Sequence, residues 1–202
     1  MDSRTRIIEE TASLFLKQGI RGITMSEIAR SMGISKRTLY EHFSNKEQLL
    51  AACMDYWHED SCRMYEKVKD SDANPMEVIH HQFRQAVIAL GQIHPSLVSD
   101  IRKHHPLIWK KQYKQMQENR LAFTIEFFEK GKKQGFFRAE HNSDITTRLL
   151  FAQVDLLHDS DLFPPTRFSK ADIFREIIFG FIRGISTEKG LKEMEKNFET
   201  QL

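Results

Sequence analysis

The sequence is poor in cysteine and has no long apolar run. Only Cys53 and Cys62 occur among 202 residues. On one helix this spacing places them on opposite sides and roughly 13 Å apart along the axis, so they cannot bridge each other. No segment approaches the roughly 20 apolar residues of a membrane-spanning helix, and none lies at the N-terminus. We therefore expect no membrane association, a cytoplasmic location, and buried free thiols rather than a redox sensor.

Signatures of catalysis and of metal binding are also missing. No Gly-rich phosphate loop, Gly-x-Ser-x-Gly elbow or Cys/His nucleophile pair occurs. The adjacent pairs His80-His81 and His104-His105 diverge on a helix, and no cysteine cluster accompanies them. An enzyme would need perturbed ionisable groups that converge in a pocket, and the sequence places none. We expect no enzyme, no metal site and no cofactor.

Strand patterns and internal repeats are absent, whereas signals for helix ends recur along the chain. With 40% hydrophobic residues, the chain has enough apolar surface for a core. A capping box at Ser44 and Glu47 is predicted to open a helix that runs to Lys69, and Asn74-Pro75 opens the next. Further helices are predicted from His94-Pro95 and over 106–130, 143–158 and 169–185, with a loop over 131–142. The predicted fold is all-α.

One segment in the first quarter of the chain has the sequence pattern of two short helices joined by a turn that contains a glycine. Thr24 and Glu27 have the Thr-x-x-Glu spacing of a capping box, so a helix begins there. Gly33 supplies the left-handed position that ends this helix. Ser35 can cap the next helix. The pattern predicts two helices joined by a tight turn.

The second helix of this segment has a polar, basic face. Leu39 and Phe43 stand four residues apart and bury one side, which leaves the other side chains exposed. From Lys17 to Lys46, six basic and two acidic residues give a charge of +4, in a chain whose total is only +2. The geometry is that of a helix-turn-helix, whose second helix enters the major groove of double-stranded DNA.

An ordinary helical hairpin is the alternative interpretation of this segment. Its turn of about three residues is too short for antiparallel neighbours in a long bundle. The exposed face also combines phosphate-binding groups with groups able to contact base edges. DNA binding is therefore the better explanation. The predicted DNA-binding residues are Thr24, Ser35, Lys36, Arg37, Thr38, Tyr40, His42 and Lys46.

A longer pattern surrounds this motif between Ile7 and Leu50. It comprises Phe15, Gly19, Gly22, Thr24, Ile28-Ala29, Gly33-Ile34-Ser35, Leu39-Tyr40, His42-Phe43, Lys46 and Leu49-Leu50. This specific pattern closely resembles the N-terminal domain of the TetR family of transcriptional regulators. The resemblance implies a third helix before the motif, and residues 2–17 have a suitable apolar stripe. We expect a DNA-binding domain at 1–46 and a helical effector-binding and dimerisation domain at 47–202.

The helix predicted at 169–185 has an unusually wide apolar stripe. Apolar residues recur from Ile173 to Ile185, and Gly180 and Gly184 stand four apart, as at a close approach of two helices. The central core helix of a monomer would also show this pattern. The resemblance favours a four-helix bundle in a homodimer, whose two recognition helices would match a palindromic operator. The predicted dimer-interface residues are Phe174, Ile178, Phe181 and Ile182.

Aromatic and methionine residues are frequent between Trp57 and Phe128. Most are expected to fill the core, but in families of this type the same region encloses an effector pocket. The predicted pocket lining is Trp57, Phe83, Val87, Ile101, Tyr113 and Phe123. The resemblance then implies a repressor, rather than an activator, which a small apolar effector releases from DNA by a population shift. The alternative is a DNA-bound protein that recruits a partner without any effector.

Overall fold

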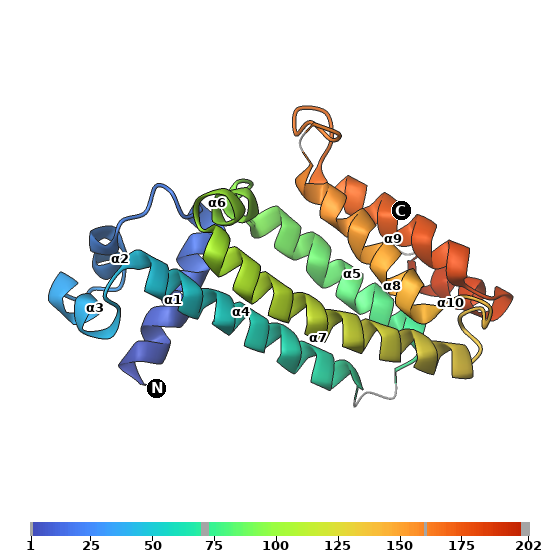
Figure 1. Ribbon diagram of the computed structural model, residues 1–202. Coiled ribbons are helices and arrows are strands. Elements are labelled where there is room, and N and C mark those ends of the chain that lie inside the picture. Colours follow the sequence, from blue (N-terminus) through green and yellow to red (C-terminus); the bar gives the residue numbers. More distant parts are fainter. Residues whose placement is uncertain (1, 70–72, 160, 199–202) are drawn as a thin grey trace. The chain divides into compact units, whose positions relative to one another are not determined.

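The computed structural model describes residues 2–69, 73–159 and 161–198, and these residues form helices joined by short connections (Figure 1). In chain order they are α1 (Ser3–Gln18), α2 (Met25–Ser31), α3 (Lys36–His42), α4 (Lys46–Lys69), α5 (Pro75–Gln92), α6 (Leu97–His104), α7 (Pro106–Lys133), α8 (Ser143–Asp155), η1 (Leu156–His158), α9 (Lys170–Ile185) and α10 (Glu188–Phe198). The predicted all-α class is confirmed. Among the described residues, no helix is long and apolar enough to cross a membrane.

The start of α4 corrects the predicted capping box by one residue. Asn45, and not Ser44, caps the helix: its Oδ1 accepts a hydrogen bond from the backbone N–H of Gln48 at 2.8 Å. The side chain of Gln48, and not that of Glu47, reaches back to the Ser44 N–H at 2.7 Å. In the sequence, the pair Ser44 and Glu47 and the pair Asn45 and Gln48 both have the spacing of a capping box. Only the path of the backbone decides which residue caps the helix.

Two stretches in the second half also differ from the prediction. Helix α7 continues through Lys133, so the connection to α8 is shorter than the expected 131–142 loop. Helix α10 was not predicted from the sequence. Its first turns are dominated by charged residues, such as Glu188 and Lys192, which form an ion pair at 2.8 Å. Its apolar residues, such as Leu191 and Met194, do follow a helical spacing, so the sequence contained a signal that the prediction missed.

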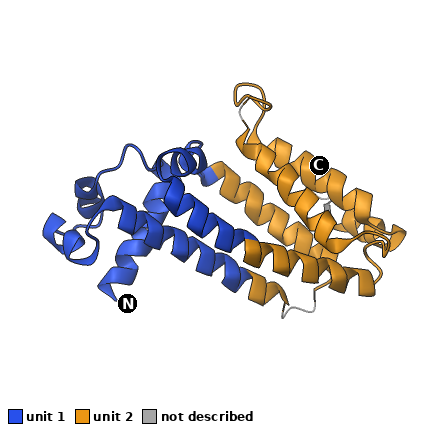
Figure 2. Ribbon diagram, in the orientation of Figure 1, with its two compact units in different colours: residues 1–64, 92–117 blue, residues 65–91, 118–202 orange. Residues whose placement is uncertain are grey.

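The chain forms two compact units (Figure 2). Unit 1 comprises the chain up to residue 64 together with residues 92–117, and therefore contains α1 to α3, most of α4, α6 and the start of α7. Phe15 of α1, Ile28 of α2 and Leu39 of α3 are fully buried in one cluster. Helix α1 thus packs behind α2 and α3, as the apolar stripe predicted.

Unit 2 comprises residues 65–91 and the chain from 118 onward. Its core contains Phe128 of α7, which meets the ring of Phe137 edge-on at 5.3 Å, and Ile182 of α9. Helix α10 approaches so closely that a Cβ at Gly190 would lie 2.3 Å from the carbonyl oxygen of Phe136. The predicted functional boundary between residues 46 and 47 lies within unit 1 and stays a prediction.

Candidate functional site

Local hydrogen bonds define the turn between α2 and α3. Thr24 Oγ1 accepts from the Glu27 N–H at 3.3 Å, and Glu27 Oε2 accepts from the Thr24 N–H at 2.7 Å, so the predicted capping box is confirmed. The N–H and hydroxyl of Thr24 lower the pKa of Glu27, which keeps the carboxylate charged. Gly33 has φ +66°, the left-handed conformation expected there. Ser35 Oγ caps α3 by accepting from the Thr38 N–H at 3.0 Å.

We expect Gly33→Ala to lower the stability of unit 1 by about 1–2 kcal/mol, because a Cβ disfavours the left-handed conformation. No atom lies within 4 Å of the added Cβ, so backbone strain is the only cost. Thermal unfolding measures the change. Gly22→Ala is the control, since Gly22 also has open space but no positive φ. Equal melting temperatures for the two variants would contradict this interpretation.

Helix α3 buries one side and exposes the other. Leu39 is fully buried, whereas the side chain of Arg37 is 90% exposed. The Lys36 ammonium lies 5.7 Å from the ring centroid of Tyr40, and Arg37 Nε lies 3.2 Å from Glu41 Oε1. An exposed ion pair of this kind contributes little to stability. Arg37 can therefore exchange Glu41 for a DNA group at small cost.

Several other residues that were predicted to contact DNA are bonded to a neighbour or partly buried. The hydroxyl oxygens of Ser35 and Thr38 lie 2.8 Å apart and bond each other. Thr38 and His42 are half-buried, whereas Thr24 is exposed at the start of α2. The structure thus groups these side chains on α3 and at the starts of α2 and α3. Their contact with DNA stays a prediction.

Lys46 is engaged within the protein, which the sequence did not indicate. Its ammonium donates a hydrogen bond to the carbonyl oxygen of Ile20, between α1 and α2. Partial burial lowers the pKa of Lys46, and the nearby charge of Glu27 opposes this shift. An ammonium has three N–H groups, so two remain for a phosphate. Lys46 also ties the first residue of α4 to the connection that precedes α2.

Comparison with known proteins identifies this motif. Residues 7–53 match the family model described as "Bacterial regulatory proteins, tetR family", and this range includes the whole of α2, the turn and α3. The chain thus has a DNA-binding domain of the TetR type. It is a DNA-binding transcription regulator.

Other similar proteins match this chain over most of its length. The HTH-type transcriptional repressor KstR2 of Mycobacterium tuberculosis is 23% identical over 150 residues, which cover 73% of this chain and 75% of that protein. A TetR-family regulator from Agrobacterium tumefaciens aligns with a TM-score of 0.72 at 14% identity, covering 91% and 97% of the two chains. A transcriptional regulator from Saccharomonospora viridis, solved in complex with choline, aligns with a TM-score of 0.71 at 20% identity, covering 92% and 98%. These relatives are regulators and not enzymes.

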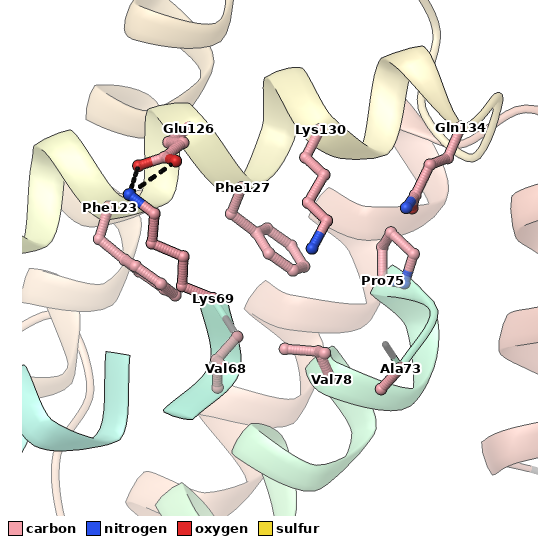
Figure 3. Close-up of a pocket in the computed structure, with 10 residues that line it drawn as sticks. All are labelled: Val68, Lys69, Ala73, Pro75, Val78, Phe123, Glu126, Phe127, Lys130 and Gln134. Atoms are coloured by element: carbon pink, nitrogen blue, oxygen red, sulfur yellow. Dashed lines mark hydrogen bonds and ion pairs between the residues drawn. The ribbon is translucent and has the colours of Figure 1, made fainter. Parts of the chain in front are cut away.

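Unit 2 contains a small pocket where the end of α4, the start of α5 and the second half of α7 meet (Figure 3). It is lined by Val68, Lys69, Ala73, Pro75, Val78, Phe123, Glu126, Phe127, Lys130 and Gln134. Lys69 and Glu126 form an ion pair at 2.9 Å, and the Lys130 side chain extends toward the pocket (Figure 3). The cavity of about 30 Å³ holds one or two waters. Ligand sites typically measure roughly 300–1,000 Å³.

The predicted effector residues are divided between the two units. Unit 1 contains Trp57, Ile101 and Tyr113, whereas unit 2 contains Phe83, Val87 and Phe123. Only Phe123 lines the pocket of Figure 3. Ile101 is 3% exposed in the core of unit 1, and the ring of Phe83 stacks on that of Phe174 at 5.7 Å. Core packing explains both the burial of Ile101 and the stacking of Phe83. The effector role of the six residues stays a prediction.

Helices α8 and α9 pack side by side and leave apolar side chains on the surface. Ile145 and Leu149, one turn apart on α8, are 58% and 55% exposed. Of the predicted interface residues, Ile182 is only 3% exposed and belongs to the core of unit 2, so it has almost no surface for a partner. The other three are half-buried on α9: Phe174, Ile178 and Phe181. Sequence reasoning missed Ile145 and Leu149, because exposed and buried apolar residues have the same periodicity.

Proposed function

We propose that this regulator is a homodimeric repressor that binds a palindromic operator and is released from it by a small effector. The observation that carries the proposal is the apolar surface of α8 and α9, where Ile145 and Leu149 are more than half exposed. Contiguous exposed apolar surface typically marks an interaction site. Pairing α8 and α9 with their copies would bury it in a four-helix bundle.

Two-fold symmetry links this dimer to the predicted mode of DNA binding. In a closed dimer each protomer presents the same surface, so two copies of α3 are related by the symmetry axis. Two recognition helices so related bind half-sites about one helical turn of DNA apart, or a multiple of it, which makes the operator palindromic. Repression is supported by the likeness to KstR2, which is named a repressor. A cytoplasmic location is part of the proposal, because the regulator must reach its DNA.

Release by an effector would require a conformation with a larger pocket. The present cavity of about 30 Å³ suits the effector-free state, and a ligand that binds only an enlarged state would shift the population toward that state. Support comes from the fold, since the similar S. viridis regulator is solved with choline. The apolar wall formed by Phe123, Phe127 and Val78, with Lys130 beside it, fits a mainly apolar small molecule.

One observation favours the second candidate, a DNA-bound protein that recruits a partner without an effector. The pocket of Figure 3 encloses only about 30 Å³, while apolar side chains such as Leu149 are exposed. A recruiter needs a surface for its partner and no ligand pocket. The two functions differ in whether a small molecule changes operator affinity.

Phe123→Ala distinguishes these functions, because Phe123 lines the pocket and its ring stacks on that of Tyr65 at 4.5 Å. Small apolar compounds that raise the melting temperature of the wild type are identified first. We then expect Phe123→Ala to change the affinity for such a compound at least tenfold and the ligand-free operator affinity less than twofold. Titration of operator complexes with the compound measures both quantities.

The control is Phe128→Ala, since Phe128 is 3% exposed in the same unit but does not line the pocket. We expect it to lower stability by about 3–5 kcal/mol without a selective change in compound affinity. If no compound stabilises the wild type, and Phe123→Ala loses as much stability as Phe128→Ala, the recruiter is the correct function.

A further inference from the structure

An unusually basic corner lies where α6 ends and α7 begins. From residue 102 to residue 114 the chain contains five lysines or arginines and no aspartate or glutamate. Four of these cations flank the corner itself and are exposed: Arg102, Lys103, Lys110 and Lys111. We call these four residues the basic corner. Helix α6 ends at His104, and α7 begins two residues later at Pro106. The Cα atom of each of the four residues therefore lies within roughly 8 Å of the junction, measured along its helix axis.

The side chains of the basic corner have no partners within the part of the chain that the structure describes. None of the four forms an ion pair or a side-chain hydrogen bond there. The lysines of α10 differ: Lys192 and Lys196 pair with Glu188 and Glu193 at 2.8 and 2.5 Å. Four exposed like charges repel one another unless an anion lies among them.

Local helix stabilisation explains only half of the basic corner. Arg102 and Lys103 lie in the last turn of α6, where cations interact favourably with the helix dipole. Lys110 and Lys111 lie instead near the start of α7, whose first turn contains no acidic residue. They lie in its second turn, beyond the first-turn reach of the helix dipole, so the dipole gives them no stabilising role. Their charges are not compensated within the described part of unit 1 and are available to an external anion.

Two contacts connect the region of the basic corner to other helices of the unit that contains the DNA-binding motif. His105 Nδ1 lies 3.4 Å from Glu47 Oε1 on the first turn of α4, and α4 begins only four residues after the last residue of α3. Before α6, the backbone N–H of His94 donates to the carbonyl oxygen of Leu16 on α1 at 2.6 Å. All these residues belong to unit 1. The corner and the recognition helix thus form parts of one compact unit.

We propose that the basic corner is a second DNA-binding surface, which contacts backbone phosphates outside the site of the recognition helix. The inference rests on DNA binding by the motif of the same unit. Duplex DNA carries about one negative charge per 1.7 Å of its axis, so it supplies several phosphates to a cluster of this size. Such contacts raise affinity for every sequence and provide no base specificity.

An anionic membrane is a poorer occupant of the same surface. Leu107, at the centre of the corner, is 83% exposed, but binding to a bilayer requires a broad apolar face as well as cations. The neighbouring apolar residues of α7, Ile108 and Trp109, pack against the core of unit 1. One leucine provides too little apolar area.

The test replaces all four residues of the basic corner by glutamine and measures operator affinity at several salt concentrations. The slope of log K against log salt concentration is negative, and each lost phosphate contact reduces its steepness by about 0.9. We expect the steepness to decrease by roughly 2 or more, equally for operator and unrelated duplexes of the same length. The matched control replaces Lys67, Lys133, Lys192 and Lys196, four exposed cations of unit 2, by glutamine.

The control separates local contacts from the change in net charge, which is the same in both variants. Equal salt slopes for the two variants would overturn the inference. Sedimentation with phosphatidylglycerol vesicles would also overturn it if binding depended on the basic corner while the slope did not. A failure of the proposed function gives a different result, because the wild type itself would then bind no operator. No salt dependence could then be measured for either variant.

Discussion

Arg37→Ala is expected to lower operator affinity by about 1–3 kcal/mol, roughly 5- to 150-fold, and to relax the preference for one base pair of each half-site. The side chain of Arg37 is 90% exposed, and its ion pair within the described part of the chain is with exposed Glu41. Its guanidinium has the donor fork that suits the two major-groove acceptors of guanine. Binding to the operator and to a set of single-base variants measures both effects.

Two further variants show whether the loss is specific. Arg63→Ala is the matched control, because Arg63 is also exposed in unit 1 and also pairs with an acidic residue of its own helix, Asp60, at 3.2 Å. It should bind the operator like the wild type. Tyr40→Phe removes only a hydroxyl, and we expect it to weaken binding to all sequences equally. If Arg37→Ala matched Arg63→Ala in affinity and base preference, α3 would not be the recognition helix.

Ile145→Asp is expected to convert the proposed dimer to a monomer. The substitution would place an unpaired carboxylate in the four-helix bundle, at a cost of several kcal/mol. Because Ile145 is 58% exposed in the single chain, the fold of the protomer should survive. Sedimentation equilibrium at micromolar concentration measures the oligomeric state, and operator affinity should fall with it.

The control for the dimer is Ile88→Asp on α5, where the isoleucine is 50% exposed in the same unit. It should remain dimeric. Phe181→Asp should dissociate the dimer as well but also lower protomer stability, because the Phe181 ring lies 6.3 Å from that of Phe128 in the core. A monomeric wild type would refute the proposed interface whatever the variants do.

The helix-turn-helix was predictable from the sequence because its determinants are local. Thr24 and Glu27, or Ser35 and Thr38, are three residues apart, and each pair satisfies the same helix end. Gly33 alone supplies the conformation of the turn. Such short-range interactions can be recognised in the sequence without knowledge of the rest of the fold.

Features that depend on distant residues were not predictable in this way. The pocket brings Val68 and Phe127 together from helices that are separated by α5 and α6 in the sequence. Ile182 and Ile178 belong to the same apolar stripe, yet one is buried in the protomer and the other is half-exposed. Hydrophobic periodicity shows that a face is apolar but not what covers it.

The shortness of α3 limits how this protein can acquire a new operator. Of its seven residues, Leu39 is held by the core, and Thr38 is held by the cap that Ser35 forms. The freely variable positions are therefore those of exposed side chains such as Lys36 and Arg37. Under the predicted mode of DNA contact, evolution or engineering of a new target would change these few exposed positions. Chains with different DNA targets can consequently keep one scaffold and one set of caps.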